Sequence, residues 1–248
     1  MSYIQIKEII EQANAGYTQP YLCQGEDEVT YIVKSRESLP AEELVYEWVS
    51  AGLARAFGLP CPKPVIMEGF GGLWPFYSNY GWHFDYDYSF ATPLVLGAMD
   101  MNYAQSLELE KDFQRDLFIF DYWIQNGDRM LSRHGGNVNL LYDNAQKKPV
   151  VIDHNQAFAP GFDPNDFSRS HVFGYDNRPD FRIDLVDQCQ LGQRLDAALG
   201  SLNTIVASMP EEWHDEANNR LGRDVIDDHI RPILEKCNKP DFWQDVEP

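Results

Sequence analysis

Three oxygen-bearing side chains, Asp128, Asn137 and Asp153, have types and spacing suited to phosphoryl transfer. Asp128 follows a predicted helix, Asn137 precedes a short apolar strand, and Asp153 ends the next apolar run. A hairpin between these runs brings Asn137 and Asp153 together, and the loop delivers Asp128. Phosphoryl transfer needs a carboxylate that orients or deprotonates the attacking hydroxyl, and hard oxygen ligands for Mg²⁺. Singly, Asp128 reads as a helix cap and Asp153 as a strand end, but the ordered set favours chemistry.

The N-terminal part supplies a lysine and a carboxylate that complement this set. Lys34 ends a predicted strand, and Glu47 lies beside Trp48 on the predicted helix that follows. Kinase-type sites hold the phosphates with a strand lysine that a helix glutamate anchors. Glu43, one turn earlier, is the competing partner for Lys34. Residues 15–19 are a candidate phosphate-covering turn, although they form neither a Walker A motif nor GxGxxG.

The elements that position these residues are strands around one helix, followed by a mainly helical half. Strands are predicted at 19–24, 29–34 and 62–68, and a helix from Pro40 to Phe57 with Gly58 as its stop. Residues 70–90 are predicted to be either an irregular connection or a packed loop followed by a strand. Further expectations are a helix at 107–125, a hairpin of 138–142 with 149–153, and helices over 185–237 broken near Pro210.

The chain resembles the HipA-like kinases, compact relatives of the bacterial HipA toxin kinase with a protein-kinase-like fold. The resemblance lies in YIVK at 31–34, EWVSAGLARAFGLPCP at 47–62, FDYWIQNGDR at 120–129, GNVNLL at 136–141, VIDHNQAF at 151–158, SHVF at 170–173 and the stretch 16–20. It implies an α+β fold of two lobes, a β-rich N-lobe (1–82) and a larger, mainly helical C-lobe (83–248). It also implies ATP bound between the lobes and transfer of its γ-phosphoryl group to a hydroxyl.

The resemblance also assigns roles to residues of this chain. Asp128 is the implied catalytic base, Asn137 and Asp153 are the implied Mg²⁺ ligands, and Asn139 matches a second asparagine that supports the metal site. The implied nucleotide-binding residues are Lys34, Glu47, Gly16, Thr18 and Gln19. Met130 to His134 looks inserted relative to the family, with Arg133 and His134 as candidate substrate contacts. The chain starts just before the phosphate turn, so we expect neither the extra N-terminal subdomain of full-length HipA toxins nor a fused DNA-binding module.

Composition and charge limit the function classes. The 248 residues carry a formal charge of −19, from 20 basic and 39 acidic side chains, which argues against direct nucleic-acid binding. The sequence lacks an apolar run long enough to span a bilayer and a signal-peptide pattern, so we expect no membrane association and a cytoplasmic location. Its four widely separated cysteines predict reduced thiols and no zinc site.

The predicted activity is therefore ATP- and Mg²⁺-dependent phosphorylation of a hydroxyl, with a protein Ser/Thr as the expected acceptor. Two alternatives remain open: a pseudokinase, and a partner-binding module of a toxin–antitoxin or phage-related complex. A small-molecule phosphotransferase also stays open, because fold does not determine the acceptor. A metal hydrolase is disfavoured, since Asp153 precedes His154 where an HD-type site needs His before Asp.

Overall fold

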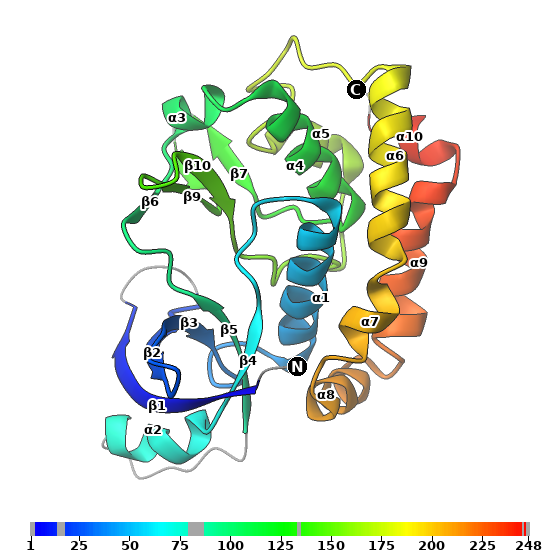
Figure 1. Ribbon diagram of the computed structural model, residues 1–248. Helices are drawn as coiled ribbons and strands as arrows, with labels where there is room; N and C mark the ends of the chain where they lie inside the picture. Colours follow the sequence, from blue (N-terminus) through cyan, green and yellow to red (C-terminus); the bar gives the residue numbers. More distant parts are fainter. Residues whose placement is uncertain (1–2, 14–17, 79–86, 133–134, 245, 247–248) are drawn as a thin grey trace.

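The computed structural model describes residues 3–13, 18–78, 87–132, 135–244 and 246. Five strands form a closed barrel at one end of the molecule, and helices make up most of the other end (Figure 1). The strand order in the barrel is β1-β2-β3-β5-β4, with β1 parallel to β4 and all other pairs antiparallel. The strands are β1 (Tyr3–Gln12), β2 (Tyr21–Gly25), β3 (Thr30–Lys34), β4 (Val65–Glu68) and β5 (Tyr88–Pro93).

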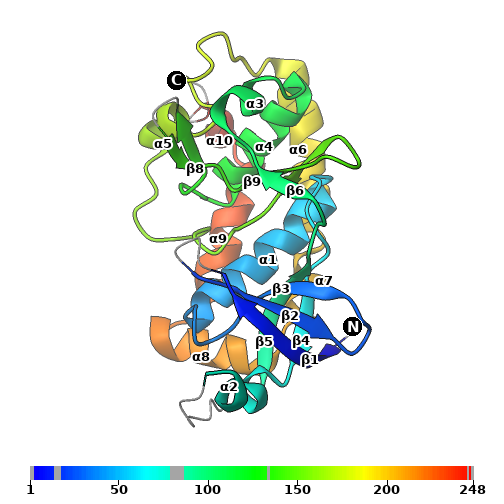
Figure 2. The ribbon, with the colours of Figure 1, turned by 90° about the vertical axis from the view of Figure 1, so that its left-hand side faces the viewer.

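A short helix, α2 (Phe70–Ser78), packs beside the barrel (Figure 2). Its Phe70 and Trp74 rings lie 4.8 and 5.3 Å from the ring of Tyr21 in the barrel core. The irregular connection predicted over 70–90 is therefore wrong for residues 70–78, because aromatic packing stabilises a helix that the glycines and proline disfavour locally. The strand of the alternative prediction is present from Tyr88, and residues 79–86 lie outside the described part.

The helix α1 (Ala41–Phe57) connects the barrel to the helical part. Pro40, the predicted first residue, is its N-cap, so the helix begins one residue later than predicted, and Gly58 ends it in the left-handed conformation (φ 99°). Its buried side chains Leu44, Val49 and Leu53 belong to the large core shared with the C-terminal helices. Figure 1 shows α6 and α7 running alongside α1. The helix that carries Glu47 is thus held mainly by the helical part.

A three-stranded antiparallel sheet lies between the barrel and the helices, in the order β10-β9-β6. Its strands are β6 (Ala98–Asp100), β9 (Leu140–Asp143) and β10 (Lys148–Val151), so the predicted hairpin is present but begins two residues later in β9. A second hairpin joins β7 (Met130–Ser132) to β8 (Gly135–Asn137). Of the stretch that looked inserted, residues 130–132 form the first strand of this ribbon.

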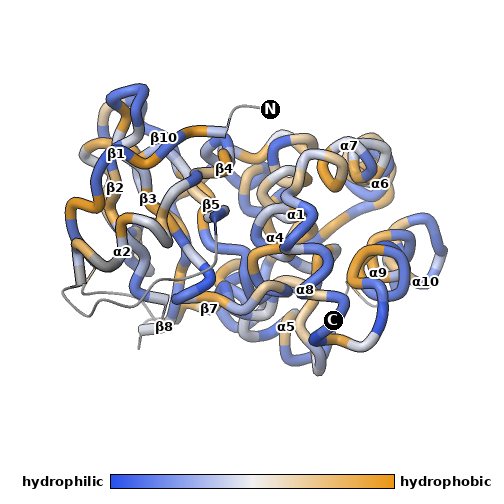
Figure 3. The backbone as a smooth tube through the Cα atoms, turned by 90° about the horizontal axis from the view of Figure 1, so that it is seen from below, coloured by the Kyte–Doolittle hydropathy of each residue, from blue (hydrophilic) through white to orange (hydrophobic). Residues whose placement is uncertain are grey.

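The remaining elements are helices. They are α3 (Tyr103–Leu107), α4 (Lys111–Trp123), α5 (Pro164–Ser170), α6 (Leu185–Leu199), α7 (Leu202–Val206), α8 (Glu211–Leu221), a π-helical turn η1 (Ile226–Ile230), α9 (Arg231–Leu234), a 3₁₀ helix η2 (Glu235–Asn238) and α10 (Asp241–Gln244). Hydrophobic and hydrophilic stretches alternate along them (Figure 3). The sequence predicted helices over 107–125 and 185–237 but did not predict α3, α5 and α10. No helix in the described residues is long and apolar enough to cross a bilayer.

The content of helix and strand confirms the predicted α+β class. The boundary of the two predicted lobes, at residues 82 and 83, stays a prediction. The strand β5 begins beyond it, at Tyr88, and pairs with β3 and β4 of the barrel.

Candidate active site

Lys34 lies at the centre of the candidate site, between two carboxylates. Its Nζ is 2.8 Å from Glu47 Oε2 and 2.6 Å from Asp153 Oδ1. Lys34 ends β3, which pairs with both β2 and β5, and Lys34 itself lies opposite Phe90 of β5. The structure therefore brings together three residues that the sequence separates by 119 positions.

The ionisation of this cluster follows from the close pairing. Burial opposes the charged form of Lys34, but Asp153 and Glu47 outweigh it and raise the pKa of the ammonium above its ordinary value. Burial likewise opposes ionisation of Glu47, yet Lys34 and the His154 contacts lower the pKa of Glu47 to about 2. Both groups are charged over the physiological pH range.

Asp153 points toward Lys34 because of its backbone conformation. It lies just after β10 and has a left-handed φ of 61°. The residues around it are tied down on both sides, since Ile152 N donates to Asn139 O (3.2 Å) and His154 N donates to both carboxylate oxygens of Glu47 (3.1 Å each). This uncommon backbone geometry is held by its surroundings, as is typical of functional sites.

Glu47, and not Glu43, is the partner of Lys34. The carboxylate of Glu43 accepts hydrogen bonds from Asn155 (2.6 Å) and Gln156 (3.1 Å) instead. His154, which follows Asp153, contributes to the site through its backbone N–H, which donates to Glu47. Its ring is buried with Nδ1 3.8 Å from Glu47 Oε1.

Asp128 forms the other part of the site, with two asparagines. Asn137 Nδ2 donates to Asp128 Oδ2 at 2.7 Å, and Asn139 Nδ2 donates to the same oxygen at 3.0 Å. Burial raises the pKa of Asp128, and repulsion from Asp153 adds to the rise, while both asparagine hydrogen bonds oppose it. The effect of Asp153 on this pKa places the two carboxylates within electrostatic range of each other.

Asn137 and Asn139 reach Asp128 from different backbones. Asn137 is exposed on β8, where the preceding Gly136 (φ 143°) lies so close to Met130 that a Cβ would be 2.2 Å from its carbonyl oxygen. Asn139 is buried and has a left-handed φ of 46°. Because each amide donates through nitrogen, both side-chain oxygens remain as candidate ligands of a cation.

A buried network beneath Asp128 was missed by sequence reasoning. The guanidinium of Arg129 is fully buried and bonds Asp121 Oδ2 (2.6 Å), Ile152 O (3.2 Å) and the carbonyl oxygen of Asn139. His171 is buried with Nε2 3.1 Å from the same oxygen of Asp121. Arg129 thereby ties the backbones of Asn139 and Ile152 together directly after Asp128. The only local signal was an arginine next to a candidate catalytic aspartate.

The predicted phosphate turn is only partly described. It joins β1 to β2, whose strands pair antiparallel, and Ala13 N donates to Pro20 O (2.8 Å) at its base. Thr18 is half-buried and Gln19 is exposed with a left-handed φ of 40°. Gly16 lies outside the described residues, as do Arg133 and His134. Among the described residues, no contact joins Thr18 or Gln19 to Lys34 or Asp153, so their roles stay predictions.

The donor set fits a hard cation better than a transition metal. Within the described residues, no group of three or more His, Cys, Asp or Glu side chains gathers in a metal-binding arrangement. One carboxylate, Asp153, and the oxygens of Asn137 and Asn139 are available instead. Mg²⁺ is bound in this way, by few protein oxygens together with water and phosphate oxygens.

Comparisons with known proteins bear on the family and the fold of the chain. A family model described as HipA-like kinase matches residues 6–246. The structure overlays on a proinflammatory kinase of Helicobacter pylori, CtkA, with a TM-score of 0.55 and 12% identity, covering 99% of this chain and 97% of that one. A Golgi casein kinase gives a TM-score of 0.46 at 12% identity, over 98% of this chain and 72% of that one. The search of curated proteins found no match. At this identity the likeness to CtkA shows a kinase-like fold alone.

Proposed function

The chain belongs to the HipA-like kinase family, and from that premise we propose that it binds ATP with Mg²⁺ and transfers the γ-phosphoryl group to a hydroxyl, with Ser or Thr of a protein as the acceptor. The family is one of phosphotransferases, so the proposal concerns the nucleotide, the metal, the acceptor and the residues. The observation that carries it is the position of Lys34 between Glu47 and Asp153.

In the proposed mechanism, Lys34 and Glu47 anchor the phosphates. An ammonium has three N–H donors, and two are directed to Glu47 and Asp153. The third is left for a phosphate oxygen. Glu47 holds the amine in place and keeps it charged, which makes Lys34 a fixed point for the nucleotide.

Asp128 is the proposed catalytic base. Both asparagine amides bind its Oδ2, and within the described residues Oδ1 accepts no hydrogen bond. That oxygen is available to accept the proton of the attacking hydroxyl, or to orient it. Asn137 and Asn139 hold the carboxylate in one rotamer. Asp153, Asn137 and Asn139 are the residues that would hold Mg²⁺, which when bound neutralises charge on the phosphates.

Incubation of the protein with ATP labelled on the γ-phosphate, with Mg²⁺, tests the proposal. We expect label on protein in the wild type and none in Asp153→Ala. Equal nucleotide binding and turnover in both proteins would contradict the mechanism. A melting shift with ATP and Mg²⁺ but no transfer would instead indicate a pseudokinase, and no shift at all would indicate a partner-binding module. Mass spectrometry of the labelled residue then identifies a Ser or Thr acceptor.

A further inference from the structure

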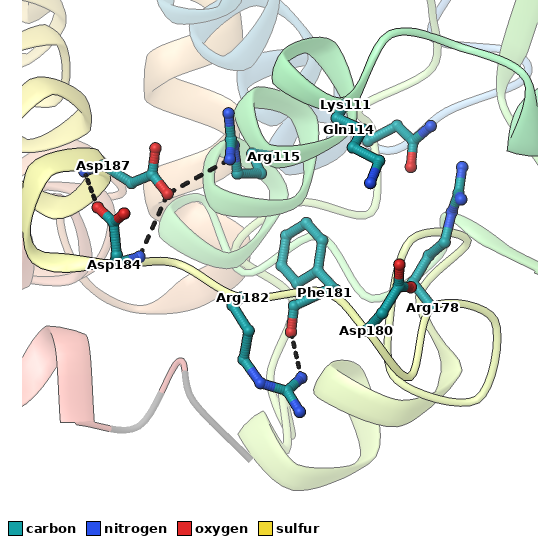
Figure 4. Close-up of a pocket in the computed structure, with 9 residues that line it drawn as sticks. All are labelled: Lys111, Gln114, Arg115, Arg178, Asp180, Phe181, Arg182, Asp184 and Asp187. Atoms are coloured by element: carbon teal, nitrogen blue, oxygen red, sulfur yellow. Dashed lines mark hydrogen bonds and ion pairs between the residues drawn. The ribbon is translucent and has the colours of Figure 1, made fainter.

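A second polar pocket lies at the far end of α4 from Asp128. It has a volume of about 240 Å³ and is formed by the first turns of α4 together with the segment that leads into α6 (Figure 4). The helix α4 has 13 residues and rises about 20 Å. Since Asp128 follows its other end, this pocket is separate from the candidate active site.

The acidic side chains on one side of the pocket already have partners. Asp184 accepts hydrogen bonds from Val186 N (2.8 Å) and Asp187 N (2.9 Å), where it caps α6. Asp187 in turn pairs with Arg115 at 3.4 Å. Figure 4 shows these contacts grouped together, on the opposite side of Phe181 from Arg178. The carboxylate of Asp184 is therefore stabilised by the N-terminus of α6, and that of Asp187 is paired with a cation.

Within the described residues, three cations of the pocket form no ion pair with an acidic side chain: Lys111, Arg178 and Arg182. Arg182 is exposed and donates to the carbonyl oxygens of Pro179 and Phe181. Lys111 is exposed in the first turn of α4, where the helix dipole disfavours a positive charge, and within the described part of the chain no acidic side chain pairs with it. Arg178 donates through Nη2 to the carbonyl oxygen of Leu107, but its Nε is buried without an acceptor among the described residues. A buried guanidinium N–H without an acceptor is costly. An anion in the pocket would therefore be attracted to these uncompensated positive charges.

The surroundings indicate which anion fits. Planar arginine donors and an ammonium near a helix N-terminus suit a tetrahedral phosphate. The pocket is larger than one phosphate group, and the ring of Phe181 lies between its two sides, so an attached side chain can pack there. Leu185 and Val186 beside it are 81% and 64% exposed and offer apolar contacts for flanking residues. In a chain of charge −19, a free anion is repelled at long range, whereas a tethered one gains from these contacts.

We propose that this pocket binds a phosphomonoester carried on a protein segment, with Lys111 and Arg178 as its ligands. The choice of a protein-borne phosphate rests on the proposed function, in which such a group is the reaction product. Binding itself needs neither ATP nor transfer. The pocket then docks an already phosphorylated protein at a distance from the transfer site.

Calorimetric titration with a degenerate peptide that carries a central phosphoserine tests this without nucleotide. We expect Lys111→Met and Arg178→Gln each to weaken binding by at least about tenfold, because each removes a charged hydrogen bond to the phosphate. Asp180→Asn, which removes a like charge from the pocket wall, is expected to strengthen binding. Lys236→Met, an exposed lysine on η2, is the matched control and should bind as the wild type does.

The other arms of the titration separate the possible sources of the anion. The unphosphorylated peptide should not bind, and inorganic phosphate should bind more weakly than the phosphopeptide. The proposal would be overturned if Lys111→Met, Arg178→Gln and Asp180→Asn all bound the phosphopeptide as tightly as the wild type does. It would also be overturned if the wild type bound the unphosphorylated peptide as tightly as the phosphopeptide. Phosphate binding as tightly as the phosphopeptide would overturn the protein source. Thermal melting of Arg178→Gln checks its fold, and the exposed Lys111 keeps the test valid if that variant unfolds. Because transfer is assayed separately, loss of transfer with intact peptide binding would reject only the proposed function.

Discussion

Two parts of the candidate site differ in their exposure to water. The anchoring half, Lys34 and Glu47, is buried, with side chains only 8% and 3% exposed. The transfer half, Asp128, Asn137 and Asn139, reaches the surface through Asp128 and the exposed Asn137. Asp153 joins the two, since it pairs with Lys34 and repels Asp128.

This difference predicts different consequences of substitution. Removing one partner of a buried ion pair lowers the stability of the fold, because the remaining charge is buried without compensation. A half-exposed carboxylate can be changed while the fold is retained. With the proposed function, we therefore expect the anchoring half to contribute to both stability and phosphate binding, and Asp128 to contribute mainly to the reaction.

The largest expected effect is on the reaction, from Asp128→Asn. Removing the base should lower the transfer rate by roughly 10²- to 10⁴-fold. The unfolding free energy should change by no more than about 0.5 kcal/mol, as for a surface change. Transfer kinetics and urea unfolding of the same preparation measure both. A large loss of stability would show that the transfer half is not separable from the core.

Glu47→Gln should break the anchoring half and lower stability as well as activity. We expect the free energy of unfolding to fall by about 3 kcal/mol. This is near the lower end of the cost of breaking a buried ion pair, because Asp153 remains paired with Lys34. The KM for ATP should rise, since Lys34 is no longer held. Glu43→Gln, one turn earlier on α1, is the matched control and should cost less. Equal losses in the two variants would contradict a special role for Glu47.

Local sequence patterns predicted many of the helices and strands around the site, but they missed elements that depend on contacts between distant residues. The strand with Lys34 and the helix with Glu47 follow from alternation, periodicity and the glycine stop. The strand β1 was missed because bulges between Ile6 and Glu8 and between Ile9 and Glu11 break its period of two, and charged residues fill its exposed face. Its existence depends on pairing with β2 and β4.

The candidate site shows the same limit. The ordered carboxylates and asparagines were recognisable as a set, and the structure places them around Lys34 and Asp128. The supporting role of Arg129 was not recognisable from the sequence, because only the tertiary structure brings its partners Asp121, Asn139 and Ile152 close to it. No periodicity or spacing signals a buried arginine of this kind.

This buried network gives a pH-dependent prediction that sharpens the comparison. Burial opposes ionisation of Asp121, but Arg129 and His171 outweigh it and lower its pKa to about 2. A lowered carboxyl pKa stabilises the fold above the ordinary pKa near 4, and this contribution is lost as the pH falls through 2. We expect the stability advantage of the wild type over Asp121→Asn to shrink by about 2 kcal/mol over that window. Urea unfolding at several pH values measures it, and a pH-independent difference would contradict the network.

The smallest expected effect concerns the packing of α1 against α7. A Cβ at Gly52 would lie 2.9 Å from Ile205 of α7, so Gly52→Ala overpacks the contact between the two helices. Overpacking costs more than the gain in helix propensity returns, and we expect a net loss of about 1 kcal/mol. Ile205→Ala in the same chain should relieve the clash. If the double variant loses as much unfolding free energy as the two single variants together, the contact with α7 does not determine the position of α1.

The central claim is that Lys34, Glu47, Asp153 and Asp128 form one Mg²⁺-dependent nucleotide site. Titration calorimetry of ATP into the wild type and Asp153→Asn, each with and without Mg²⁺, tests it most directly. We predict that Mg²⁺ tightens ATP binding to the wild type and leaves binding to Asp153→Asn unchanged. An equal gain from Mg²⁺ in both proteins would contradict the account.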